Sequence, residues 1–153
     1  MLFLMLCEDF WTYWTHRAFH TPLMYNMIHK KHHAYKSTVA WAAEYTHPFE
    51  LIFGNALPIF SGVLFLGKDI TTIGYSFFIW WRITKTAESH SGYNNKVSFY
   101  NLLPFSANPD NHNYHHYRFK GNYGSFFTFW DFMGGTFNKA YINDKIYAYK
   151  RQG

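Results

Sequence analysis

The sequence predicts an all-α protein whose helices form a bundle in a membrane. Residues 51–67 and 70–81 carry no charged side chain, and the first stretch reaches the lower length limit of a spanning helix, about 17 residues. Charged residues make up 15% of the chain, against about 25% in ordinary soluble domains, and aromatic residues make up 24%. Histidines recur three and four positions apart, the spacing that places side chains on one face of a helix.

The N-terminal region is expected to form two consecutive helices. Residues 2–20 are dense in apolar and aromatic side chains, and neither glycine nor proline interrupts them. Thr21 and Pro22 then provide a helix-start signal, an N-cap threonine followed by proline at the first helical position. The second helix should therefore run from Pro22 to about Tyr35.

The two uncharged stretches are predicted to form a membrane hairpin over about residues 48–82. Lys68 and Asp69 lie between the stretches and are expected to form the turn, and Pro58 interrupts the first arm. An alternative is a buried hairpin inside a soluble all-helical domain, because a core helix can be equally apolar.

The C-terminal half is expected to contain two short helices. Residues 91–109 are rich in Asn, Gly, Ser and Pro and are predicted to be irregular. A helix carrying residues 112–116 follows, and residues 125–132 form a short aromatic helix that ends before Gly134 and Gly135. Residues 138–153 are expected to be a polar tail.

Composition excludes several classes of protein. The net charge of +5 fits either solubility or attraction to the anionic cytosolic face of a membrane. The basic residues do not form a run with interleaved aromatics, so no nucleic-acid partner is expected. Cys7 is the only cysteine, which excludes an internal disulfide and a cysteine-rich zinc site. Any metal must be held by histidine and carboxylate side chains.

The ten histidines fall into three clusters and two single residues. The clusters are His16 with His20, His29 with His32 and His33, and His112 with His115 and His116, while His47 and His90 stand alone. Neutral imidazole is a good ligand for transition metals, and rings one helical turn apart can bind one ion together. We expect all three rings of the second cluster on one side of its helix, with Lys30 and Lys31 facing away.

Eight clustered histidines exceed what one ion needs, so the sequence predicts two metals close together. Iron, copper, manganese and zinc all accept imidazole, and the spacing does not choose among them. Hydrolytic two-metal sites usually contain bridging carboxylates, and no acidic residue lies inside the three clusters. A histidine-rich metal pair beside an apolar hairpin instead favours oxygen activation and attack on a C–H bond of a lipid.

Five stretches resemble the fatty acid hydroxylase/sterol desaturase superfamily of membrane di-iron oxygenases. They are "EDFWTYWTHRAFH", "MIHKKHHAY", "AAEYTHPFE", "ESHSGY" and "LPFSANPDNHNYHHYRFKGNYGSFFTFWDFMGGT", in the order found in that family. Residues 1–137 are therefore expected to form a fatty acid hydroxylase-like domain. Within the superfamily, "AEYTHPFE" and "ESHSGY" most resemble the methylsterol monooxygenases, also called 4-methylsterol oxidases.

The resemblance implies a four-helix membrane core under a cytosolic cap that holds two iron ions. It implies O2 as oxidant and electrons from NAD(P)H through a b-type cytochrome or an equivalent reductase. The implied reaction is stepwise oxidation of a 4-methyl group of a sterol precursor in a multi-pass protein of the endoplasmic reticulum membrane, with the metal site facing the cytosol.

The resemblance also implies roles for individual residues. The eight clustered histidines match the family's metal-binding and catalytic positions, and His90 matches a further ligand. His47 matches a recurrent position that is either a ligand or a support for one. Glu44, Glu50 and Glu88 are candidates to orient imidazoles through the free ring N–H, or else are ordinary helix-end or surface carboxylates.

The sequence departs from the family pattern in two respects. The apolar sequence before the first cluster is short, so we expect an upstream helical pair to be missing. Asn94 and Asn111 stand where the family often has an acidic residue and a histidine. The alternatives are a sterol desaturase, a fatty acyl or sphingolipid hydroxylase, a truncated non-catalytic metal-binding membrane protein, and a soluble zinc-binding module.

Overall fold

The computed structural model describes residues 1–36, 38–95 and 97–144. Throughout these residues the secondary structure is helical, with one isolated β-bridge between Ser106 and Phe127, so the all-α prediction is confirmed. The elements are α1 (Leu2–Phe19), α2 (Pro22–Met27), η1 (His29–Ala34), η2 (Ala40–Glu44), α3 (Pro48–Glu50), η3 (Leu51–Ala56), α4 (Leu57–Leu66), η4 (Gly67–Asp69), α5 (Thr72–Ser89), η5 (Phe99–Leu102), α6 (Pro109–Arg118), α7 (Phe129–Met133) and η6 (Ala140–Ile142).

The second predicted helix is shorter than expected. It begins at Pro22, as its start signal indicates, but ends at Met27 instead of continuing to Tyr35. Ile28 has φ −126° and ψ −64°, which is outside α-helical geometry, and the chain continues from His29 as a 3-10 helix. The second histidine cluster therefore lies on a 3-10 helix, whose tighter winding changes the directions of its side chains.

The predicted hairpin forms, but its two arms differ. The helical stretch Pro48–Asp69 is, among the residues described, the one helix long and apolar enough to cross a membrane. It includes a π-helical segment, Leu51–Ala56, which ends two residues before Pro58. Proline has no N–H to donate to the preceding turn, and the wider winding accommodates that loss. The second arm, α5, carries Arg82 and Lys85 and does not reach the same hydropathy.

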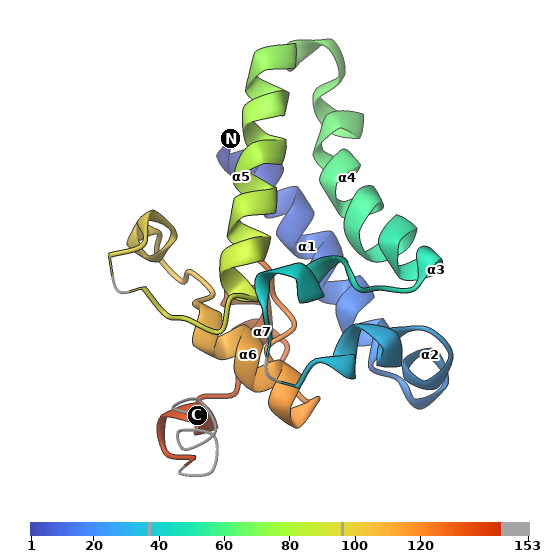
Figure 1. The fold of residues 1–153 in the computed structure, drawn as a ribbon. Coiled ribbons are helices and arrows are strands. Elements are labelled where there is room, and N and C mark those ends of the chain that lie inside the picture. The colour runs from blue at the N-terminus through green and yellow to red at the C-terminus, as the bar shows by residue number, and fades with distance from the viewer. Residues whose placement is uncertain (37, 96, 145–153) are drawn as a thin grey trace.

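The two arms rise together from a cap that contains α2, α6 and α7 (Figure 1). Helix α1 packs against α4, and the two backbones approach closely at Gly62, where a Cβ would lie 3.3 Å from Leu4 Cα. Buried apolar side chains near this crossing join α1, α5 and the 126–127 segment: Leu4, Met5, Phe78, Phe126 and Phe127.

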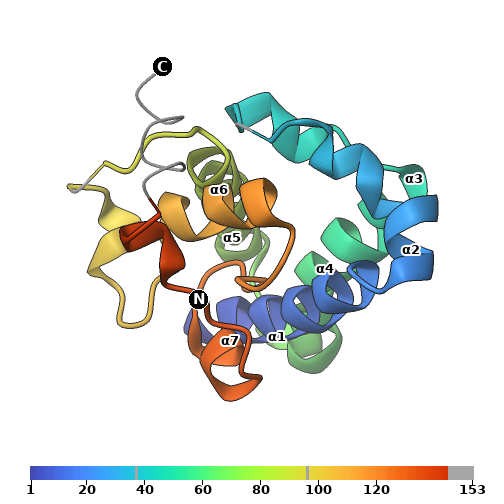
Figure 2. The ribbon, with the colours of Figure 1, turned by 90° about the horizontal axis from the view of Figure 1, so that it is seen from below.

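Buried acidic side chains on α1 attach it to the rest of the chain. Glu8 forms an ion pair with Arg82 of α5, and both side chains are buried. Asp9 Oδ1 accepts hydrogen bonds from three successive backbone N–H groups, at residues 125–127. Seen from below, α7 lies beside α1, and α6 lies across the end of α5 (Figure 2). These contacts position the segment between α6 and α7 against α1.

Candidate metal centre

Nine of the ten histidines converge in the cap and form two adjacent groups. We call them the five-histidine group and the four-histidine group. The five-histidine group contains His16, His20, His29, His33 and His115, and the four-histidine group contains His32, His90, His112 and His116. In each group the candidate ligand atoms all lie within 4.8 Å of one another, close enough to hold a metal ion.

Each H-x-x-H-H cluster supplies both groups, which differs from the expectation that its three rings share one side. His32 and His33 enter different groups, and so do His115 and His116. Successive side chains on an α-helix point about 100° apart, and on a 3-10 helix about 120° apart. Two adjacent histidines therefore send one ring to each group.

In four of the nine rings, Nδ1 is bonded to a backbone carbonyl oxygen, an atom that can only accept. His16 Nδ1 lies 3.0 Å from the carbonyl oxygen of Tyr123, and His115 Nδ1 lies 2.6 Å from that of Gly121. His90 and His116 make the same contact with the carbonyls of Thr86 and Tyr35. A carbonyl oxygen has no proton to donate, so Nδ1 carries the ring proton. Each Nε2 then presents a bare lone pair.

In the five-histidine group, the Nε2 atoms of several rings face one another at short range. His29 Nε2 lies 3.0 Å from His20 Nε2 and from His33 Nε2, and His20 Nε2 lies 3.1 Å from His115 Nε2. His16 Nε2 is buried and has no hydrogen-bond partner among the described residues.

The four-histidine group has the same arrangement. His112 Nε2 lies 2.9 Å from His90 Nε2 and 3.2 Å from His116 Nε2, while His90 Nε2 lies 3.4 Å from His32 Nε2. Imidazole nitrogens bind metals at about 2.0–2.1 Å, so two ligands are about 2.9 Å apart at a right angle and about 3.4 Å apart at a tetrahedral angle. Converging lone pairs repel one another unless a cation lies between them. Both groups therefore fit a metal ion.

Burial keeps these rings neutral, which is the form that binds metals. Burial is the main cause that lowers the pKa of His90 from 6.5 to about 4. The pKa values of His32 and His115 are also far below the usual range, through burial first and neighbouring imidazoles second. Neutral rings offer Nε2 to a metal without first losing a proton.

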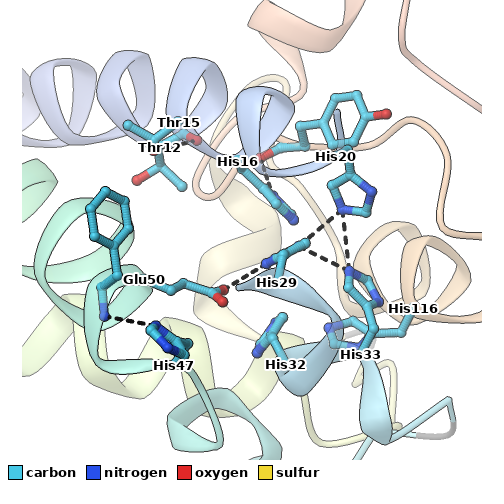
Figure 3. Close-up of polar contacts among 12 residues, drawn as sticks. Thr12, Thr15, His16, His20, His29, His32, His33, His47, Glu50 and His116 are labelled. Atoms are coloured by element: carbon cyan, nitrogen blue, oxygen red, sulfur yellow. Dashed lines mark hydrogen bonds and ion pairs between the residues drawn. The ribbon is translucent and has the colours of Figure 1, made fainter. Parts of the chain in front are cut away.

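Of the three glutamates expected to orient imidazoles, the structure pairs only Glu50 with a histidine. Glu50 Oε1 lies 2.8 Å from His29 Nδ1, and both side chains are buried (Figure 3). Glu44 is exposed at the end of η2. Glu88 is half-buried on α5, and its charge interacts with that of Lys85. Each of the two therefore lacks the contact that an orienting role requires.

His47 lies apart from both groups. Its Nδ1 accepts a hydrogen bond from the backbone N–H of Phe49, at 3.1 Å, and so caps α3 (Figure 3). The two asparagines that depart from the family pattern are also outside the groups. Asn94 donates to Asp110 at 2.6 Å, and Asn111 is buried, with its backbone carbonyl accepting from the side chain of Asn122.

Sequence reasoning missed the acceptors that hold the rings in place. They are mostly backbone carbonyls of connecting segments, such as Gly121 and Tyr123. Every residue has a carbonyl, so no side-chain pattern could have identified them. Asp9 was also missed, although a carboxylate in an apolar helix is itself a signal that a partner lies nearby.

A cavity of about 70 Å³ lies against both histidine groups. His16 and His29 reach it from the five-histidine group, and His32, His90 and His112 reach it from the four-histidine group. The other lining residues come from α1, η2, the first hairpin arm, α5 and the segment before α7: Thr12, Thr15, Phe19, Ala43, Thr46, Glu50, Gly54, Asn55, Arg82, Thr86, Ser89, Tyr123, Gly124 and Ser125.

Comparison with known proteins identifies relatives of this chain. A C-4 methylsterol oxidase of Schizosaccharomyces pombe is 39% identical over 126 residues, which cover 81% of this chain and 42% of that protein. Methylsterol monooxygenase 1 of Danio rerio is 38% identical over 90% of this chain and 47% of its own length. A very-long-chain aldehyde decarbonylase of Oryza sativa is 38% identical over 95% of this chain and 54% of its own length.

The chain spans about half the length of these curated relatives. No solved structure matches it. The family model for fatty acid hydroxylases matches residues 1–136, which include all nine converging histidines. The chain therefore belongs to the fatty acid hydroxylase family.

Proposed function

We propose that this chain forms the metal-binding part of a membrane-bound di-iron monooxygenase that oxidises the 4-methyl group of a sterol precursor. The observation that carries the proposal is the convergence of nine imidazoles in two adjacent groups, with a cavity that rings of both groups reach. The sterol substrate is supported by the similarity to a C-4 methylsterol oxidase and a methylsterol monooxygenase. The reaction runs stepwise, from methyl through alcohol and aldehyde to carboxylate.

The two histidine groups would each hold one iron ion, with His47 left out of the ligand set. Bound iron supplies the activation of O2, which no protein side chain can perform alone. Each oxygen insertion consumes O2, two electrons and two protons, and it releases water with the hydroxylated product. We propose that the electrons come from NAD(P)H through a b-type cytochrome or an equivalent reductase.

The chain's own residues position the ligands and limit access of water. The carbonyls of Tyr123 and Gly121 and the carboxyl of Glu50 fix the rings of His16, His115 and His29, so each Nε2 keeps its direction. The cavity against both groups is small and lined mostly by buried side chains, which limits the water that reaches the reacting C–H bond.

A membrane location is supported by the apolar surface of the hairpin. Large apolar side chains on both arms are strongly exposed, among them Leu64 (77%), Phe65 (72%) and Ile73 (83%). Water-exposed patches of this kind are rare in soluble monomers, whereas lipid covers them at no cost. We propose that the hairpin, about residues 48–82, lies in the endoplasmic reticulum membrane and that the histidine cap faces the cytosol. A sterol would reach the cavity from the bilayer.

A second candidate function is removal of the carbonyl group from a very-long-chain aldehyde. The similarity to the rice aldehyde decarbonylase, at 38% identity over 95% of this chain, favours it. The two substrates share an apolar body that partitions into membranes, and the two reactions would use the same histidines.

Complementation of a yeast strain that lacks its 4-methylsterol oxidase tests the proposal. Sterols and hydrocarbons are measured by mass spectrometry, with His32→Ala as the inactive control. Consumption of 4,4-dimethylsterol is the expected result. If the chain is present in the membrane and 4,4-dimethylsterol still accumulates, the sterol proposal is wrong. Conversion of a supplied aldehyde to an alkane would then favour the second candidate, and a desaturated sterol or hydroxylated acyl chain would favour another activity of the superfamily.

A further inference from the structure

Glu50 is the one acidic residue that lines the cavity between the histidine groups, among the residues described. It lies at the start of the π-helical part of the first hairpin arm, and it is 5% exposed. Its side chain reaches from the hairpin towards His29 (Figure 3). A polar group from the membrane-facing arm is thereby placed beside the metal centre.

Only one oxygen of the Glu50 carboxyl group is used within the described structure. Oε1 bonds to His29 Nδ1 at 2.8 Å, whereas Oε2 is buried and has no hydrogen-bond partner. A buried polar atom without a partner is unfavourable, so native structures normally supply one. Other buried carboxyl oxygens also lack partners, on Glu8, Asp9 and Glu88, but those residues do not line the cavity.

We propose that Glu50 Oε2 binds a hydroxyl group of the substrate, carried on the carbon next to the one that bears the oxidised methyl. This inference rests on the proposed function, because every sterol has a hydroxyl on the ring carbon adjacent to C4. Glu50 bonds to a proposed metal ligand and lines the cavity that both histidine groups reach, so a hydroxyl bound to Oε2 would hold the adjacent carbon of the substrate near the metal centre. The chemical class of the substrate is therefore a lipid alcohol with a neighbouring methyl group.

This subsite accounts for discrimination against lipids without such a hydroxyl. Thr46 and Asn55 line the same cavity and add polar surface near the start of the hairpin. A substrate lacking the hydroxyl would leave Oε2 buried and unpaired. A site built to bind a hydroxyl rejects the analogue without it strongly, on the order of 10²-fold or more in kcat/KM.

The test compares three 4-methylsterols that differ only at the neighbouring carbon: the 3-hydroxy, 3-deoxy and 3-oxo forms. Glu50→Gln keeps a carbonyl oxygen for His29 and places an amide N–H₂ where Oε2 stands. The amide N–H₂ can donate but not accept, so it suits a ketone, whereas Oε2 of the carboxyl group can accept from a hydroxyl. Turnover of each sterol is measured in membranes that contain the wild-type chain, Glu50→Gln, or the matched control Glu44→Gln, which changes an exposed carboxylate. Iron content is measured in parallel.

The wild-type chain and Glu44→Gln should both turn over the 3-hydroxy form faster than the 3-deoxy form. Glu50→Gln should lower the ratio of 3-hydroxy to 3-oxo turnover about tenfold. A purely structural role through His29 would reduce the turnover of all three sterols by the same factor and leave the 3-hydroxy to 3-oxo ratio unchanged. An unchanged ratio, or equal use of the 3-hydroxy and 3-deoxy forms by the wild-type chain, overturns the subsite while the sterol function stands. If the wild-type chain oxidises no 4-methylsterol, the proposed function is wrong and the subsite with it.

Discussion

His115 and His116 are adjacent in the chain, yet their rings belong to different histidine groups. His115 Nδ1 is fixed by the carbonyl of Gly121, and His116 Nδ1 by that of Tyr35. An anchor from the segment after α6 and an anchor from the end of η1 thus divide one dipeptide between two candidate metal sites. The same division occurs at His32 and His33 on η1.

The division predicts that single histidine variants lose one ion each. His115→Ala should impair the five-histidine group and His116→Ala the four-histidine group, so each variant should retain about one of the two proposed ions, and the double variant close to none. Metal analysis of the purified proteins measures this, and sterol oxidation should be abolished in both single variants. His47→Ala is the control and should keep its full metal content. Retention of both ions in either single variant contradicts the assignment of the rings.

Asp9 is predicted to stabilise the segment that anchors two of the rings. Asp9→Ala leaves the backbone N–H groups of residues 125–127 without their acceptor, and this should cost about 3 kcal/mol or more of unfolding free energy. The carbonyls of Gly121 and Tyr123 lie next to this segment, so metal affinity of the five-histidine group should fall as well. Denaturant unfolding and metal titration provide the measurements.

The conservative variant tests the hydrogen bonds of Asp9 on their own. Asp9→Asn keeps an acceptor oxygen and should lose less stability than Asp9→Ala. Asp69→Asn, in the exposed turn of the hairpin, is the control and should be near neutral. Equal stability of Asp9→Ala and the wild-type chain would show that these hydrogen bonds do not fix the segment.

Gly62 is predicted to be required for the close approach of α1 and α4. A Cβ at this position would lie 2.6 Å from Leu4 Cδ2 and 3.3 Å from Leu4 Cα, so Gly62→Ala should destabilise the chain by about 1–3 kcal/mol. Leu4→Ala removes the nearer atom, and the double variant should be less destabilised than the sum of the single variants. Thermal unfolding checks this. Strict additivity would mean that the two residues do not meet.

The metal-free protein should lose stability as pH falls. The pKa of His90 is lowered from 6.5 to about 4 in the folded state, so the unfolded chain binds protons more readily between these values. The stability that comes from neutral buried rings is complete above pH 6.5 and is lost as the pH falls towards 4. Thermal unfolding of chelator-treated protein at about pH 7.5 and about pH 5 measures the effect. An unfolding temperature that does not fall at the lower pH contradicts this.

Much of the fold could be predicted because its signals are local. The run of apolar residues without glycine or proline sets α1, and Thr21 with Pro22 sets the start of α2. The end of α2 could not be predicted, since the backbone geometry of Ile28 comes from how the second cluster meets its partners. The apolar residues of the second hairpin arm predict a membrane segment. They do not reveal that Arg82 of this arm pairs with Glu8, which is far away in the sequence.

The sequence by itself determined that histidines of these types and spacings are present, because helical periodicity places residues three and four apart on adjacent turns. Only the tertiary structure decided which ring joins which group. That choice depends on carbonyls and on Glu50, which come from segments distant in sequence, and on the tighter winding of η1. His47 shows the same limit: its residue type suits a metal, but its place in the fold makes it a helix cap.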